Sequence, residues 1–159
     1  MTPADGWEVL LAKVIPLVVF LLGVVCLAVA ATRLVFGLPF RGSVLFFLFS
    51  SVLYVFVGIG IGMLLGTLCR SQRQAQLASF FINIPLIQLS GTVVPFDTMP
   101  AFLQVLSTVD PLRYYAIIAR GVILKGAGPD VLWPAALLLA FFAVLMLALS
   151  IGRFRRQLT

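Results

Sequence analysis

The chain has 159 residues, of which 62% are hydrophobic and 10% charged, and its mean hydropathy is +1.19. Soluble domains are about 45–50% apolar and 25% charged, so this chain cannot hide its apolar surface in water. Its net charge of +6 would suggest nucleic acid for a soluble protein, but Lys and Arg stand at the ends of apolar runs, where they meet lipid headgroups. The composition therefore predicts an integral membrane protein that does not bind nucleic acid.

Four runs lack any charged residue: Val14–Thr32, Gly42–Cys69, Gln74–Phe96 and Val131–Gly152. Each is close to or longer than the ~20 residues that a helix needs to cross the hydrocarbon core, and none alternates as the strands of a membrane barrel do. The fold class predicted is an all-α membrane protein with four transmembrane helices. The short connector Arg70–Arg73 makes the second and third spans antiparallel neighbours.

The second span carries glycines at four-residue spacing, Gly58, Gly62 and Gly66. This repeat is a small-xxx-small face, which lets two membrane helices approach closely. The surrounding glycine run completes neither the dinucleotide-binding fingerprint nor a phosphate loop. We expect helix packing here, against a helix of this chain or of another.

The third span places its polar residues on one narrow face at 100° per residue. Candidate members are Gln76, Ser79, Asn83 and Ser90. Hydrogen bonding between helices is the commoner explanation for such residues. The alternative is a face that lines a substrate pathway, because polar groups within the membrane usually face a bundle interior or a cavity.

Two short helices, Met99–Thr108 and Pro111–Leu124, are expected between the third and fourth spans. Thr98 and Asp110 stand where N-caps are preferred, and Pro111 suits a first helical position. Each helix is too short to cross the membrane. They predict a re-entrant or interfacial helical hairpin.

Arg113 and Arg120 lie seven residues apart, on one face of the second short helix, and Tyr114 lies beside them. Anchoring to lipid headgroups is the simpler interpretation, because long cationic side chains and amphipathic aromatics favour that level. A gate or a substrate contact is the alternative. The candidate hairpin residues are thus Asp110, Pro111, Arg113, Tyr114 and Arg120.

Catalysis is not expected in this chain. It has no histidine and five carboxylates, and Asp110 and Asp130 stand at predicted helix starts, where capping explains them. Cys26 and Cys69 lie in or at the end of separate spans and match no metal or redox spacing. Neither an enzyme nor a cofactor or metal site is predicted.

The orientation is expected to place both termini in the cytoplasm. Lys and Arg divide almost evenly between the two sides, and the concentrated basic tail Arg153–Arg156 decides for this arrangement.

The order of several motifs resembles the carboxy-terminal half of ABC-2 type permeases, in the branch of bacterial multidrug-efflux-like permeases. The motifs are Thr2-Pro3 with Trp7-Glu8 and Lys13, Arg70–Gln76, Ser90–Phe96 with Met99-Pro100, Asp110–Tyr115, Arg120-Gly121 and Leu124–Gly126. Asp110–Tyr115 is the most specific of these, and the resemblance covers essentially the whole chain.

The resemblance implies the membrane subunit of an ATP-binding cassette exporter in the bacterial inner membrane. Such permeases form homo- or heterodimers and are driven by a separate cytoplasmic ATPase subunit that binds ATP. Drugs or other hydrophobic compounds are one expected substrate class, and the sequence does not distinguish them from lipid or polysaccharide. By analogy, Asp97–Gly128 would be the extracytoplasmic re-entrant hairpin, and Met1–Lys13 would adjoin the segment that meets the ATPase.

The chain departs from the family pattern in one respect. Members have six spans and, in this branch, a large extracytoplasmic domain after the first, whereas residues 1–159 begin where the third span would begin. A partial permease domain is therefore expected. The alternative function is a stand-alone four-span scaffold or oligomeric channel without an ATPase, to which the glycine face of the second span is equally suited.

Overall fold

The computed structural model describes the backbone of residues 6–35, 37 and 41–158, with side chains for those between 12 and 153. Much of the expected ATPase-facing segment Met1–Lys13, and the side chains of Arg155 and Arg156, lie outside the described residues. The described chain is helical and contains no strand. Its α-helices are α1 (Gly6–Leu34), α2 (Val44–Leu68), α3 (Gln72–Leu89), α4 (Ala101–Ser107), α5 (Pro111–Arg120) and α6 (Pro129–Leu158).

Three helices are long and apolar enough to cross a membrane: Ala12–Leu34 in α1, Val44–Leu68 in α2 and Pro129–Arg153 in α6. They confirm three of the four predicted spans. The uncharged run Gln74–Phe96 continues beyond its helix, because α3 ends at Leu89 and Gly91 then adopts the left-handed conformation with φ +76°. Because its first turn is polar, α3 is not apolar enough to count among the helices that could cross a membrane.

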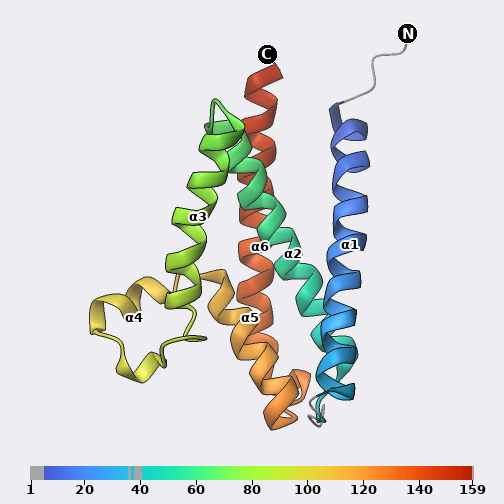
Figure 1. Ribbon diagram of the computed structural model, residues 1–159, viewed down its shortest axis with the longest axis vertical. Coiled ribbons are helices and arrows are strands. Elements are labelled where there is room, and N and C mark those ends of the chain that lie inside the picture. The colour runs from blue at the N-terminus through green and yellow to red at the C-terminus, as the bar shows by residue number, and fades with distance from the viewer. Residues whose placement is uncertain (1–5, 36, 38–40, 159) are drawn as a thin grey trace.

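The chain runs back and forth between two ends of a helical bundle (Figure 1). The start of α1, the turn between α2 and α3, and the end of α6 all lie at the upper end. From that turn α3 descends only part of the way, and α5 continues towards the lower end, from which α6 returns. Between α3 and α5, α4 projects sideways from the bundle.

The core lies where α2, α5 and α6 meet, around residues such as Val57, Ile118 and Leu139. The backbones of α2 and α6 come close at Gly60, where a Cβ atom would lie 2.8 Å from Cβ of Met146. Ser150 uses this proximity and donates a hydrogen bond to the Gly60 carbonyl at 2.6 Å. In lipid, where burial of apolar surface drives association only weakly, such close packing holds helices together.

At the lower end, the connection between α1 and α2 docks onto a π-helical turn, η2 (Gly121–Lys125). The Gly42 amide donates to the Val122 carbonyl at 3.0 Å, and a Cβ atom on Gly42 would lie 2.8 Å from that same oxygen. Just beyond η2, a Cβ atom on Gly126 would lie 2.8 Å from Cβ of Arg41. We call this contact the glycine joint.

The predicted cap at Thr98 is wrong. Residues Phe96–Thr98 form a short 3₁₀ turn (η1), in which the Thr98 hydroxyl donates to the Pro95 carbonyl, and α4 begins only at Ala101. Pro100 is the physical reason, because a proline disfavours the helical conformation in the residue before it, and Met99 is extended with ψ 141°. The predicted cap at Asp110 is confirmed.

Candidate functional site

A cavity of about 290 Å³ lies between α2, α3 and the start of α5. Its wall includes the polar residues Tyr54, Ser79, Asn83 and Asp110, together with glycines and aliphatic side chains of α2. Such a concentration of polar groups is unusual in a bundle whose helices are otherwise apolar. We call it the Asp110 cavity.

Ser79 and Asn83 face the cavity from successive turns of α3. The Ser79 hydroxyl donates to the Ala75 carbonyl at 2.8 Å, and the Asn83 amide nitrogen donates to the Ser79 carbonyl at 2.9 Å. Each side chain thus donates one hydrogen bond to a backbone carbonyl of its own helix. Their oxygen atoms remain to accept hydrogen bonds from whatever enters the cavity.

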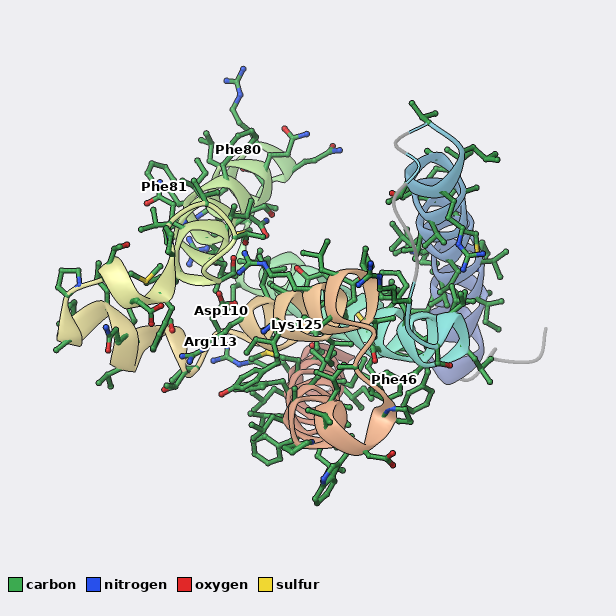
Figure 2. The ribbon with its side chains drawn as sticks, turned by 90° about the horizontal axis from the view of Figure 1, so that it is seen from below. Phe46, Phe80, Phe81, Asp110, Arg113 and Lys125 are labelled. Carbon is green, nitrogen blue, oxygen red and sulfur yellow. The ribbon has the colours of Figure 1, made fainter. Side chains whose placement is uncertain are left out.

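Asp110 is 2% exposed and forms the N-cap of α5. Its Oδ1 accepts a hydrogen bond from the Leu112 amide at 2.9 Å, but its buried Oδ2 has no hydrogen-bond partner. Burial raises the pKa of this carboxyl to about 6, although the Leu112 amide and the positive charge of Arg113 act in the opposite direction. Figure 2 shows Asp110 in the region between α3 and α5.

Tyr54 contributes the aromatic part of the wall from α2. Its ring stacks on that of Tyr115, with centroids 4.7 Å apart, and the Tyr115 hydroxyl lies 3.0 Å from the Ser51 hydroxyl oxygen. No motif or spacing in the sequence marked Tyr54 as a candidate site residue. The signal available was the crowding of aromatic residues in the first half of the second span, which does not distinguish a cavity wall from a packed core.

Of the four polar residues predicted to share one face of the third span, two line the Asp110 cavity and two do not. Ser79 and Asn83 lie on the cavity wall, whereas Gln76 is exposed and does not line this cavity. Ser90 is buried at the end of α3, where its hydroxyl donates to the Ile87 carbonyl at 2.7 Å. Asp110 and Pro111, from the predicted hairpin, join Ser79 and Asn83 at the cavity.

The two hairpin arginines contact groups within the chain. Arg113 donates to the Ser107 hydroxyl at 2.7 Å and lies 4.1 Å from the centre of the Phe96 ring. Arg120 donates to the Gly91 carbonyl at 2.6 Å. They therefore fasten α5 to the segment between it and α3.

Tyr114 adds a further tie within the hairpin. Its hydroxyl donates to the Thr108 carbonyl at 2.7 Å, and its ring stacks on Phe142 of α6 with centroids 5.9 Å apart. The side chain therefore links the start of α5 both to the end of α4 and to the bundle.

The glycine face of α2 meets no other helix of the described chain. Cβ atoms added at Gly58, Gly62 or Gly66 would find nothing within 4 Å, and the close packing occurs instead at Gly60, on a different face. Gly58 and Gly62 line the Asp110 cavity and also a second, apolar cavity of about 600 Å³ between α1 and α2. No helix of the described chain packs closely on these three glycines, and their packing against a helix of another chain stays a prediction.

The described residues contain no cluster of three or more His, Cys, Asp or Glu side chains that could hold a metal ion. The polar groups on the wall of the Asp110 cavity are a carboxylate, a serine hydroxyl, a side-chain amide and a phenol.

The family model for the ABC-2 type transporter matches residues 2–124. This chain belongs to the ABC-2 type transporter family. It is 32% identical over 133 residues to the probable multidrug ABC transporter permease YbhR of Escherichia coli K12, a match that covers 84% of this chain and 36% of YbhR. No solved structure matches it significantly.

Two further permeases of the same organism are similar. The probable multidrug ABC transporter permease YbhS is 32% identical over 152 residues, covering 95% of this chain and 40% of YbhS. The inner membrane transport permease YhhJ is 28% identical over 162 residues, covering 98% and 42%. The chain thus spans about two-fifths of the length of these relatives.

Proposed function

We propose that this chain forms part of the translocation pathway of an ATP-binding cassette exporter, with the Asp110 cavity on that pathway. The observation that carries the proposal is the meeting of Ser79, Asn83 and Asp110 around one cavity in an apolar bundle. Polar groups within a membrane usually face a cavity, a pathway or a partner. The names of YbhR and YbhS support drugs or other hydrophobic compounds as the substrate class.

The energy for transport comes, in this proposal, from a separate ATPase subunit, and a second permease completes the pathway. Membership of the family supports both partners. The open glycine face of α2 offers a surface where a second permease could approach closely.

We further infer that α3 makes a fourth crossing of the bacterial inner membrane, with both termini in the cytoplasm. An 18-residue helix such as α3 rises about 27 Å. In this arrangement the hairpin enters the membrane from the outer face.

The test is substitution of Asn83 by Leu in an exporter assembled with its ATPase. Leucine keeps the branched shape and the number of side-chain heavy atoms but loses the acceptor, so we expect export of a dye substrate to fall severalfold while assembly, judged by co-purification of the ATPase, is unchanged. Gln88→Leu, on another face of α3, is the matched control. Unchanged export by the Asn83 variant would remove this residue from the pathway.

The ATPase partnership has its own test. The tagged chain is expressed together with a cassette ATPase encoded by an adjacent gene. It should retain that ATPase through purification in detergent. If the chain instead purifies alone as a homo-oligomer that conducts solutes without ATP, the stand-alone channel is the correct function.

A further inference from the structure

Asp110, on the wall of the Asp110 cavity, has a buried carboxylate oxygen with no hydrogen-bond partner in the described chain. Oδ1 of Asp110 is used by the Leu112 amide, while Oδ2 is buried and has no partner. An isolated buried carboxylate is costly, and such groups in proteins are normally paired with a cation or hydrogen-bonded. The nearest cation does not serve, because the Arg113 guanidinium is directed to Ser107 and to the Phe96 ring.

Two further side chains of the cavity keep an oxygen atom available as an acceptor. Ser79 and Asn83 direct hydrogens to backbone carbonyls, so that their oxygens remain as acceptors. The ring of Tyr54 also lines the cavity, and aromatic faces attract cations. A ligand that suits this wall brings several donors and a positive charge.

We propose that the Asp110 cavity binds a protonated amine carried on a short apolar group. A primary ammonium has three hydrogens to donate, which matches Asp110 Oδ2 and the oxygens of Ser79 and Asn83. The volume of about 290 Å³ accommodates a small amine or the headgroup end of a larger amphiphile. This inference rests on the proposed function in one respect, that the amine is a substrate or lipid met on the export pathway.

Binding depends on the charge of Asp110. The groups that face this carboxyl are Arg113 on its own helix, Tyr54 on α2, and the uncharged Ser79 and Asn83 on α3. With a pKa of about 6, the carboxyl is largely ionised at pH 7.5 and largely protonated at pH 5. Amine binding should therefore be about tenfold weaker at pH 5 than at pH 7.5.

The experiment measures saturable binding of radiolabelled hexylamine to the purified 159-residue chain in phosphatidylcholine nanodiscs at pH 7.5. Asp110→Asn preserves the cap, because asparagine caps helices as well as aspartate does. We expect it to weaken hexylamine binding at least about tenfold and to leave binding of hexan-1-ol unchanged. Asp97→Asn, at an exposed carboxylate in η1, is the matched control and should bind as the wild type does.

A second variant keeps the test decisive if Asp110→Asn does not fold. Gly62→Leu adds a side chain where a Cβ atom meets nothing within 4 Å and should fill part of the cavity. It should abolish binding of both probes. Equal hexylamine binding by wild type and Asp110→Asn, or hexylamine binding retained in Gly62→Leu, would overturn the proposal.

Two further arms identify the source of the amine and separate this inference from the proposed function. Phosphatidylethanolamine in the nanodiscs competes with hexylamine if a lipid headgroup is the natural ligand, and has no effect if the ligand is a small transported amine. Hexylamine binding needs neither ATP nor an ATPase. Binding by a chain that supports no export would overturn the proposed function alone, whereas amine export by Asp110→Asn at the wild-type rate would overturn this inference alone.

Discussion

At the scale of single residues, close helix packing depends on a glycine that the four-residue pattern omits. The regular spacing of Gly58, Gly62 and Gly66 indicates a packing face, yet Gly60 is the residue that touches α6. The spacing describes which residues share a face, and it does not say which face meets a neighbour. That choice depends on where α6 lies, which is set by the rest of the fold.

The substitution Gly60→Ala tests this contact. A Cβ atom there would lie 2.8 Å from Cβ and 3.0 Å from the backbone carbon of Met146, so α2 and α6 must separate. We expect a loss of about 1–3 kcal/mol in the free energy of unfolding, measured by denaturation in detergent micelles. Gly58→Ala meets no atom and should be neutral or slightly stabilising. Equal effects of the two variants would contradict the assignment.

Asp110 confers a pH dependence on stability. Its pKa is 3.8 ordinarily and about 6 in the folded chain, so the folded state binds the proton more tightly. Its contribution to stability is therefore full below pH 3.8 and is lost as the pH rises through about 6. Unfolding free energies of wild type and Asp110→Asn, compared between pH 4 and pH 7.5, should diverge in this window, with the wild type losing stability relative to the variant. Parallel profiles would show that the carboxyl titrates normally.

At the scale of elements, three long spans and the hairpin helices follow from sequence, while their exact ends and contacts do not. Asp110-Pro111 predicted the start of α5 correctly because a cap and a first-turn proline act locally. The cap predicted at Thr98 was wrong because Pro100 moves the start of α4 to Ala101. The segment between α3 and α5 is held by Arg113 and Arg120 through partners distant in sequence, which no local pattern reveals.

The tether from Arg120 to Gly91 can be tested by hydrogen exchange. Arg120→Gln removes a charged donor at 2.6 Å from the Gly91 carbonyl, a type of bond worth about 1.5–3 kcal/mol. Amides in residues 91–99 should then exchange at least about tenfold faster, while those of α6 are unaffected. Lys125→Gln, at an exposed cation, is the control and should leave the exchange of residues 91–99 unchanged.

At the scale of the whole molecule, the fold class was predictable from composition and the cavity was not. Ser79 and Asn83 share a helix face by periodicity alone, so their proximity could be inferred. Their meeting with Asp110 requires that α3 stop partway and that α5 begin beside it, as Figure 1 shows. Only the three-dimensional path of the chain supplies that arrangement.

The same path makes a prediction about topology. Because the start of α1 and the end of α6 lie at one end of the bundle, reporter proteins fused to the two termini should report the same compartment. A reporter inserted at Gly37, between α1 and α2, should report the other. Alkaline phosphatase and fluorescent-protein fusions measure this in intact bacteria, and termini in opposite compartments would contradict the fold.

The glycine joint has a mechanical consequence. It joins Gly42, just before α2, to Val122 in η2, which is 80 residues away in sequence but in direct backbone contact in space. Because a Cβ atom at Gly42 or Gly126 would lie 2.8 Å from its neighbour, we expect the start of α2 and the turn after α5 to move together. A shift of α5 at this end should therefore reach α2 by two routes, the backbone contact at the joint and the shared core with α6.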